Sequence, residues 1–345
     1  MKVSITDIKS RAEKIFIKAG LSQDDAKIIT AVLLETEMRG VFTHGFIRLE
    51  RYINCIKSGG IKADGKYSVL FDSPSWASID GNDNLGIVIS YKAMSLAMEK
   101  AKTTGVGIVN VKGSHHFGAA GYYTSMCADN NMIGMAMSNG DILIAATGCA
   151  EKTIGNNPFS FAYPAGKYGK VVYDIAMSHT SDQKVIRAAK DGEPIPSGWI
   201  IDKDGNQTTD PAEYLKGGTL LPFGGYKGYG LAMMVELLAA VTSGAAVTED
   251  VHAWNTNPEK GGNTGHFFMA IDLSKLGDPE EYKNKVDVMV DKIKSAKKAD
   301  GVEKVFYPGE IEKDKMQKCL DLGYVEILDD TMASIDRIEK ELFGD

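Results

Sequence analysis

Two histidines stand side by side in the segment GSHHFGAAGYY (residues 113–123), directly after an apolar run that predicts a strand. The chain has only six histidines, so an adjacent pair in a glycine-flanked turn is a candidate for chemistry. Neighbouring side chains on an extended segment point to opposite sides, and no HxxxH, HExxH or Cys/His set accompanies the pair, so we expect no metal site. One ring could exchange a proton with a ligand while the other supports the turn. A purely structural turn explains the stretch equally well.

A histidine and an arginine four residues apart form a second candidate, in RGVFTHGFIRLERY (residues 39–52). Residues four apart on a helix share a face, so the spacing predicts that His44 and Arg48 project together from the start of a helix. A guanidinium binds a carboxylate through two hydrogen bonds, and an imidazole exchanges a proton with a neighbouring oxygen, which suits a 2-hydroxy or 2-oxo acid. The spacing alone also fits a turn and a surface ion pair between Arg48 and Glu50.

The common nucleotide and hydrolase fingerprints are absent from the sequence. No G-x-G-x-x-G follows a predicted strand, no Walker A lysine is present and no G-x-S-x-G elbow occurs, so neither a Rossmann site nor a serine hydrolase is supported. The segment LPFGGYKGYGLAMM (residues 221–234) places Lys227 among glycines at a predicted helix start. A phosphate would fit there, although a solvated lysine explains the pattern too.

The composition indicates an ordinary globular protein, with 345 residues, 43% of them apolar and 25% charged, and a formal net charge of −7. A mildly acidic chain without basic runs argues against nucleic acid as a partner. No apolar stretch reaches the roughly 20 residues of a membrane span, since Glu236 interrupts YGLAMMVELLAAVTSGA, and no signal peptide is recognisable, so we expect no membrane association. The four scattered cysteines fit a reduced protein of the cytoplasm.

Helices and strands must position these candidates. Helical spacing predicts helices over residues 5–19, 22–40, 46–58, 86–105, 119–131, 229–243 and 278–298, with Ser22 as a helix cap. Strands are expected over residues 106–111, 132–139, 159–164, 171–178 and 266–273. The order predicts a mixed α/β core, with helices from both ends of the chain forming a second layer.

Five segments occur in the same order in one protein family. They are RGVFTHGFIRLERYINCIKSGGI, GVGIVNVKGSHHFGAAGYY, IGNNPFSFAYP, PSGWIIDKDGNQTTDP and LPFGGYKGYGLAMMVELL, and together they resemble the type-2 malate/L-lactate dehydrogenases over residues 6–309. The resemblance implies an NAD(P)-dependent enzyme that transfers a hydride between nicotinamide and C2 of a small 2-hydroxy or 2-oxo acid, of the malate or lactate type. The alternatives on the same fold are ureidoglycolate or sulfolactate dehydrogenation, and reduction of a cyclic imine or a diketo acid.

The resemblance also implies an architecture. The cofactor would bind a non-Rossmann domain with a largely antiparallel sheet, and the protein would be a homodimer. We expect an N-terminal helical region over residues 1–75, a cofactor-binding and catalytic core over residues 76–309, and C-terminal helices over residues 310–345 that pack with the N-terminal region. NAD is the expected cofactor and NADP the alternative.

Site residues follow from the matching motifs. His44 and His116 become the acid/base candidates, and His116 is preferred to His115 because it matches the family's S-x-H-x-G. Arg48 becomes the clamp for the substrate carboxylate, with Thr43 beside it. The cofactor residues that the resemblance implies are Asn139, Gly140, Asp174, Ile175, Ala176, Met177, Ser178, His179, Thr180, Lys227, Pro308, Gly309 and Glu310.

Some positions depart from the family pattern. Thr43 replaces a serine, Gln183-Lys184 replaces the usual Gly-Lys, and AATGCAEK (residues 145–152) replaces a segment with proline and paired glycines. The family resemblance therefore does not identify the substrate of this chain. Two other classes are weaker: a non-catalytic protein would be expected to lack His44, Arg48 or Lys227, and a metal-dependent hydrolase using His115 and His116 lacks further ligands.

Overall fold

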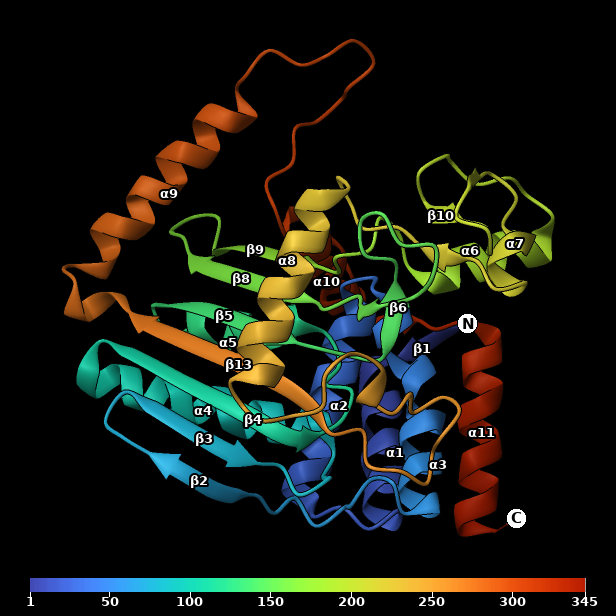
Figure 1. Ribbon diagram of the computed structural model, residues 1–345. Coiled ribbons are helices and arrows are strands. Elements are labelled where there is room, and N and C mark those ends of the chain that lie inside the picture. Colours follow the sequence, from blue (N-terminus) through green and yellow to red (C-terminus); the bar gives the residue numbers. More distant parts are fainter. Residues whose placement is uncertain (345) are drawn as a thin grey trace.

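A seven-stranded sheet lies at the centre of the structure, a computed structural model that describes residues 1–344 (Figure 1). The strand order is β2-β3-β4-β13-β5-β8-β9, and every neighbouring pair is antiparallel except β3 and β4. The mixed α/β class expected from the sequence is confirmed. The strands are β2 (Ser68–Asp72), β3 (Trp76–Asp80), β4 (Val106–Ser114), β5 (Met132–Ser138), β8 (Phe159–Pro164), β9 (Lys170–Ile175) and β13 (Thr264–Asp272).

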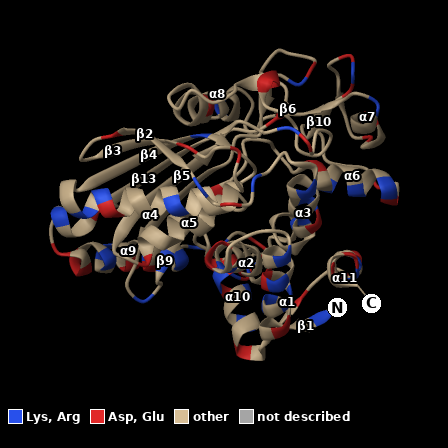
Figure 2. Cartoon of the chain, turned by 90° about the horizontal axis from the view of Figure 1, so that it is seen from below, with Lys and Arg blue, Asp and Glu red and all other residues tan. Residues whose placement is uncertain are grey.

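Helices cover both faces of this sheet. α4 (Gly86–Thr104) and α5 (Ala120–Ala128) pack on one face, and α8 (Tyr226–Glu236) lies across the other (Figure 2). α4 approaches β4 so closely that a Cβ at Gly107 would lie 1.9 Å from the carbonyl oxygen of Ala97. This contact fixes the strand that leads directly into His116.

A smaller sheet lies beside the end of the main one. Its strand order is β11-β10-β12-β6-β7, and two helices accompany it. These elements are β6 (Ile142–Ile144), β7 (Ile154–Gly155), β10 (Ile200–Ile201), β11 (Gln207–Thr208), β12 (Thr219–Leu220), α6 (Asp182–Asp191) and α7 (Ala212–Leu215). The bridge between Ser178 and Pro222 joins this region to the segment that follows β9.

Helices from both ends of the sequence form one layer around a shared apolar core. They are α1 (Ile5–Lys18), α2 (Gln23–Met38), α3 (Leu49–Ser58), α10 (Glu310–Leu322) and α11 (Asp329–Phe343). β1 (Lys2–Ser4) pairs with β14 (Tyr324–Glu326) in antiparallel register, and Arg11 forms ion pairs with Asp336 and Glu339 at 2.5 and 2.6 Å. Ser22 caps α2 as predicted, because its hydroxyl accepts a hydrogen bond from the Asp25 N–H at 3.1 Å.

Two predicted helices differ from the observed ones. The helix expected over residues 46–58 begins with two 3-10 turns, η1 (Phe42–His44) and η2 (Phe46–Arg48), before α3 starts. The helix expected over residues 229–243 begins at Tyr226 and widens into the π-helix η3 (Leu237–Val241). The helix expected over residues 278–298 is α9 (Pro279–Lys294), which projects from the sheet in Figure 1. Two further 3-10 turns are η4 (Thr248–Asp250) and η5 (Leu273–Lys275).

Within residues 1–344, no helix is both long and apolar enough to cross a membrane.

Candidate active site

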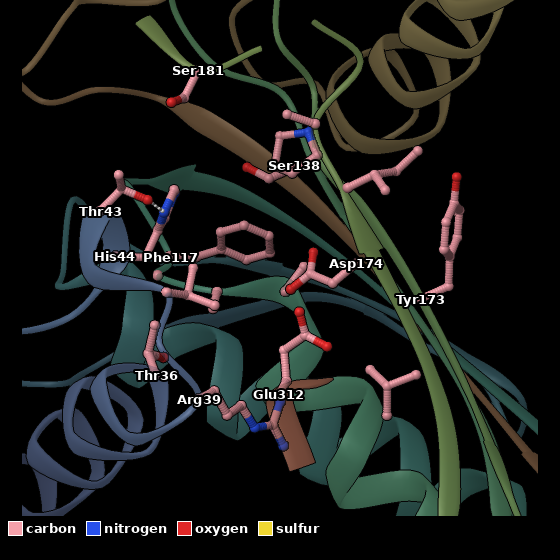
Figure 3. Close-up of a pocket in the computed structure, with 18 of the residues that line it drawn as sticks. Thr36, Arg39, Thr43, His44, Phe117, Ser138, Tyr173, Asp174, Ser181 and Glu312 are labelled. Carbon is pink, nitrogen blue, oxygen red and sulfur yellow. Dashed lines mark hydrogen bonds between the residues drawn. The ribbon is translucent and has the colours of Figure 1, made fainter. Parts of the chain in front are cut away.

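A deep cleft with a volume of about 1060 Å³ separates the helical layer from the end of the main sheet. Its walls come from α2, the turns η1 and η2, the segment after β4, β9, α10 and the loop that contains Trp254. Figure 3 shows Thr43 and His44 on one side of the cleft, and Asp174, Arg39 and Glu312 at another. A cavity of this size is enough for a ligand as large as a dinucleotide.

Three rings stack in one part of this cleft. The rings of His44 and His116 are 5.4 Å apart at 24°, and the ring of His116 lies 4.6 Å from that of Trp254 at 11°. His44 comes from η1 and His116 from the turn after β4, so the stack joins the helical layer to the sheet. The two predicted acid/base candidates are therefore neighbours in one site.

Hydrogen bonds orient both imidazoles. The Tyr52 hydroxyl lies 2.6 Å from Nδ1 of His116, and the Thr43 hydroxyl lies 2.9 Å from Nδ1 of His44. The Gly118 N–H donates to the same Nδ1 of His116 at 3.4 Å, and an N–H group can only donate. Nδ1 of His116 is therefore the acceptor, and the proton of the neutral ring sits on Nε2.

Both histidines are neutral near pH 7. Burial and the nearby charge of Arg48 lower the pKa of His44 to about 3. Burial, followed by the charges of His44 and Arg48, holds the pKa of His116 well below its usual value. Burial also raises the pKa of Tyr52 far above its usual value, so the phenol keeps its proton. An anionic ligand beside Arg48 would favour protonation of either imidazole by Coulomb attraction.

Arg48 carries a positive charge into the cleft. Its Nε donates to the Thr43 carbonyl at 2.6 Å, and its guanidinium lies 5.8 Å from the Trp254 ring centroid. Within residues 1–344 no carboxylate lies within ion-pair distance of Arg48, although burial lowers its pKa. A half-buried guanidinium without a counter-ion favours an anionic ligand, and its fork geometry matches a carboxylate.

Glu37 fixes the turn that carries His44 and Arg48. Its Oε2 accepts the Phe46 N–H at 2.8 Å, and a Cβ at Gly45 would lie 1.9 Å from the same oxygen. Only glycine fits between this carboxyl and the histidine, which explains the His44-Gly45 sequence. Burial raises the pKa of Glu37 to about 7.

The wall after β9 presents three hydroxyls without hydrogen-bond partners in the part of the chain that the structure describes. They are the buried side-chain oxygens of Ser178, Thr180 and Ser181, and all three residues line the cleft. A buried hydroxyl without a partner costs free energy, so these groups favour a polar ligand.

Acidic side chains face the cleft at the Asp174 end. The Gly121 N–H donates to Oδ2 of Asp174 at 2.7 Å, and Glu312 from α10 reaches toward the same space (Figure 3). The nearby Arg39 is already engaged, because its Nη2 lies 2.5 Å from Glu35 and 3.1 Å from the Ser125 hydroxyl.

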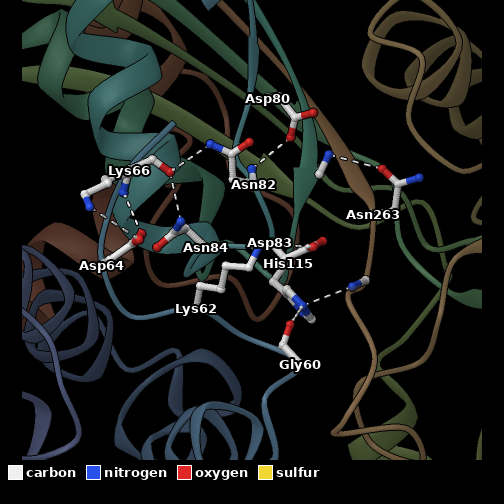
Figure 4. Close-up of polar contacts among 12 residues, drawn as sticks. Gly60, Lys62, Asp64, Lys66, Asp80, Asn82, Asp83, Asn84, His115 and Asn263 are labelled. Atoms are coloured by element: carbon white, nitrogen blue, oxygen red, sulfur yellow. Dashed lines mark hydrogen bonds and ion pairs between the residues drawn. The ribbon is translucent and has the colours of Figure 1, made fainter. Parts of the chain in front are cut away.

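His115 lies in a different environment from His116. Its ring is buried, with Nε2 2.8 Å from the Gly60 carbonyl and 3.0 Å from the Gly262 nitrogen, which donates to it (Figure 4). The ring thus joins the end of α3 to the loop before β13. Among residues 1–344, no group of three or more His, Cys, Asp or Glu side chains is arranged to hold a metal ion.

Most of the residues implied by the family motifs line the cleft, and four do not. Met177 is buried in the core, His179 and Lys227 face solvent outside the cleft, and Glu310 forms ion pairs with Lys294 and Lys304. Those that line it are Thr43, His44, Arg48, His116, Asn139, Gly140, Asp174, Ile175, Ala176, Ser178, Thr180, Pro308 and Gly309.

Sequence reasoning missed several residues of the site. Trp254 lies in a loop without periodicity, and helical spacing groups Tyr52 with the apolar residues of the helix expected over residues 46–58. Asp141 lines the cleft next to the expected Asn139-Gly140 turn, and burial together with Asp182 raises its pKa.

Comparison with known proteins gives one family. The sequence model of the family described as malate/L-lactate dehydrogenase matches residues 3–336. A malate dehydrogenase of Pyrococcus horikoshii is 39% identical over 336 residues, which cover 95% of this chain and 92% of the relative. An L-sulfolactate dehydrogenase of Methanocaldococcus jannaschii is 40% identical over 302 residues, 87% of this chain and 86% of the relative. The ureidoglycolate dehydrogenase (NAD(+)) of Escherichia coli is 29% identical, over 96% of this chain and 93% of the relative.

Solved structures of two of these relatives are also similar. The sulfolactate dehydrogenase from Methanocaldococcus jannaschii superposes with a TM-score of 0.93 at 37% identity, over 99% of this chain and 97% of that one. The malate dehydrogenase from Pyrococcus horikoshii OT3 gives a TM-score of 0.91 at 36% identity, over 100% and 96% of the two chains. The similarity therefore extends over the whole fold, including the cleft.

Proposed function

The chain belongs to the malate/L-lactate dehydrogenase family, and on this basis we propose that it oxidises a small 2-hydroxy acid, or reduces the 2-oxo acid, with a nicotinamide cofactor. Arg48 carries the proposal, because it is half-buried, has no carboxylate partner among residues 1–344 and stands beside two stacked histidines. This combination can hold a carboxylate and exchange a proton with the adjacent oxygen. The expected substrate is of the malate or lactate type.

Arg48 binds the substrate carboxylate through its two-pronged guanidinium, which leaves the C2 hydroxyl beside the histidine pair. The bound nicotinamide ring supplies the hydride acceptor. In oxidation the C2–H bond breaks with its electron pair going to the acceptor, the hydroxyl proton goes to an imidazole nitrogen, and a C2=O bond forms. Nε2 of His116 is the favoured proton acceptor and His44 is the alternative. Nε2 has a free lone pair only in the tautomer with the ring proton on Nδ1, where the Tyr52 hydroxyl oxygen can accept that proton. In reduction the same nitrogen returns the proton.

The cofactor would lie along β9 and the segment after it, on a largely antiparallel sheet rather than a Rossmann domain. The unpartnered hydroxyls of Ser178, Thr180 and Ser181 would accept and donate hydrogen bonds to it. The Asn139-Gly140 turn and Pro308-Gly309 line the same cleft. These contacts use the residues that the family motifs imply, without Met177, His179, Lys227 and Glu310, which lie outside the cleft.

The acidic end of the cleft supports NAD over NADP. Asp174 and Glu312 present carboxylates that can accept hydrogen bonds from ribose hydroxyls and that repel a 2′-phosphate. The nearby cations are engaged elsewhere: Lys170 pairs with Asp129 at 2.6 Å, and Lys313 donates to the Tyr168 carbonyl at 2.9 Å. We expect Glu312→Lys to tighten NADPH binding and weaken NADH binding in fluorescence titrations. Equal affinity of the wild-type chain for both cofactors would contradict this assignment.

A second copy of the chain would cover α8. The helix and its π-helical extension expose Tyr226, Met233, Leu237 and Val241 at 69, 38, 49 and 55%, spaced as one stripe. A contiguous apolar face of this kind is typical of a subunit interface. We expect light scattering to show a dimer, and Leu237→Lys to shift it toward the monomer. A wild-type monomer at all concentrations would exclude the homodimer.

A dehydrogenase screen tests the proposed function. L-malate, L-lactate, sulfolactate and ureidoglycolate are offered with NAD and with NADP, and oxaloacetate and piperideine-2-carboxylate with the reduced cofactors. We expect turnover of L-malate or L-lactate with NAD. Preference for the cyclic imine would indicate that the protein is a cyclic-imine reductase on the same fold. No turnover together with no NADH binding would overturn the proposal.

A further inference from the structure

Glu236 is a buried carboxylate outside the cleft. It is 4% exposed and lies on α8 at the point where the helix widens into η3. Throughout residues 1–344 no Lys, Arg or His forms an ion pair with it. A buried charge of this kind is stable only when other polar groups satisfy it.

Three neutral donors from three separate segments satisfy it. The side-chain amide of Asn139 lies 3.1 Å from Oε1, and the Thr248 N–H donates to the same oxygen at 3.0 Å. The side-chain amide of Asn157 donates to Oε2 at 2.7 Å. A carboxylate only accepts hydrogen bonds, so its two oxygens can accept from all three donors at once. A glutamine at this position would place its own NH₂ group opposite one of these donors, and that hydrogen bond would be lost.

One of these donors, Asn139, lines the cleft, and a second, Asn157, lies between two residues that line it. Asn139 precedes Gly140, and its Oδ1 accepts the Gly265 N–H at 2.8 Å, which ties the turn to β13. Asn157 has a φ of +34° and lies between Asn156 and Pro158, which both line the cleft. The Asn156 carbonyl in turn accepts the Met177 N–H at 2.7 Å, directly before Ser178.

The third donor starts the loop that reaches the histidines. Thr248 has a φ of +50° and opens the segment that leads to Trp254, whose ring stacks on His116. Asn139 also donates to the Ala246 carbonyl at 2.9 Å, in the same loop. One carboxylate therefore holds both the proposed cofactor wall and the base of the loop that packs on the proton-transfer residue.

We propose that Glu236 is a positioning residue that sets the cofactor wall and the Trp254–His116 stack relative to each other. The proposal rests on the proposed hydride transfer between a cofactor on that wall and a substrate beside His116. Hydride transfer depends steeply on the distance and angle between the two reacting carbons. A carboxylate that touches neither ligand can thus control turnover through the two walls that it joins.

The test replaces Glu236 by glutamine, which keeps the size and removes one acceptor. We expect kcat to fall about tenfold to a hundredfold, while KM for the acid and Kd for NADH change by less than about threefold. Asp272→Asn is the matched control: this residue is a 6% exposed carboxyl at the far end of β13, bonded to Ser274. We expect it to lower the melting temperature with kcat unchanged.

A second readout does not depend on turnover. In a chain with Trp76→Phe and Trp199→Phe, Trp254 is the single remaining tryptophan. We expect its emission to shift to longer wavelength in Glu236→Gln, because the loop loosens and water reaches the ring. Asn157→Gly tolerates the positive φ and removes the amide that donates to Oε2 of Glu236. We expect it to give the same emission shift and the same loss of kcat.

The outcomes separate the two proposals. If the wild type turns over no acid, the proposed function fails, and an unchanged Trp254 emission in both variants overturns the role of Glu236 as well. If the wild type is active, a folded Glu236→Gln chain with wild-type kcat overturns the positioning role alone. An equal loss of kcat in Asp272→Asn also overturns the positioning role of Glu236, because any buried carboxyl would then have the same effect.

Discussion

The hydroxyl of Tyr52 and Nδ1 of His116 lie 2.6 Å apart, although the two residues are 64 positions apart in the sequence. The tyrosine comes from the helical layer and the histidine from the turn after the central strand β4. The contact fixes the orientation of the imidazole, and the hydroxyl can donate to Nδ1 or accept a proton from it.

Removal of this hydroxyl should impair proton transfer without emptying the cleft. In Tyr52→Phe the ring stays packed, but Nδ1 of His116 loses the hydroxyl oxygen that can accept its proton, so the tautomer with a free lone pair on Nε2 is disfavoured. We expect kcat to fall roughly tenfold to a hundredfold and Kd for NADH to stay unchanged. Steady-state kinetics and fluorescence titration measure the two quantities. Wild-type kcat in this variant would show that the hydroxyl has no part in setting the tautomer.

The two stacked histidines can be separated by substitution. His116→Asn should lower kcat by roughly a hundredfold to ten thousandfold, because the proton acceptor is lost, while cofactor binding persists. His44→Asn should have a smaller effect if it only packs beside His116. If His44→Asn loses more activity than His116→Asn, His44 is the proton acceptor. Full activity in both variants would refute a role for either ring.

Arg48→Lys tests the carboxylate clamp. Lysine keeps the charge and loses the two-pronged geometry, so we expect KM for the acid to rise roughly tenfold to a hundredfold. Arg51→Lys is the control, because Arg51 also lies over the Trp254 ring, at 5.3 Å, without lining the cleft. Similar KM values for both variants would show that charge rather than geometry binds the substrate.

Glu37 should make stability fall as the pH rises. Its pKa is about 7 in the folded chain and near 4.5 when unfolded, so between these values the folded state holds more protons. The free energy of unfolding therefore decreases from about pH 4.5 to about pH 7 and stays low above it, by roughly 3 kcal/mol at most. Glu37→Gln removes this decrease, and its amide oxygen still accepts the Phe46 N–H.

Urea unfolding at pH 5 and pH 8 measures the effect. We expect Glu37→Gln to match the wild type at pH 5 and to be more stable at pH 8. If the free energies of unfolding of the two proteins differ by the same amount at pH 5 and pH 8, the pKa of Glu37 is not raised.

Long periodic segments gave the fold reliably. The strand predicted over residues 159–164 is β8 with the same bounds, and the helix expected over 278–298 is α9, capped by Asp278. The strands β10, β11 and β12 escaped prediction because two residues are too few to show an alternating pattern, and β12 also pairs with β6, which is distant in the sequence. Local pattern contains no information about such partners.

The site was predictable where its residues share a motif. The spacing of His44 and Arg48 indicated a common site, although two 3-10 turns rather than one helix bring them together. Tyr52 was hidden because its ring packs as an apolar side chain while only its hydroxyl acts. Trp254 lies in an irregular loop, and Glu236 acts through segments that are 79 and 97 residues away. Such contacts arise only in the folded chain.

The helical layer that carries His44 and Arg48 is completed by residues from the other end of the sequence. β1 pairs with β14, Arg11 binds Asp336 and Glu339, and Arg337 lies 2.6 Å from Glu50 at the start of α3. During synthesis a ribosome must therefore translate past α11 before α1 and α3 gain their final packing. The central sheet can assemble earlier, so the nascent chain acquires its proposed cofactor surface first and its substrate clamp last.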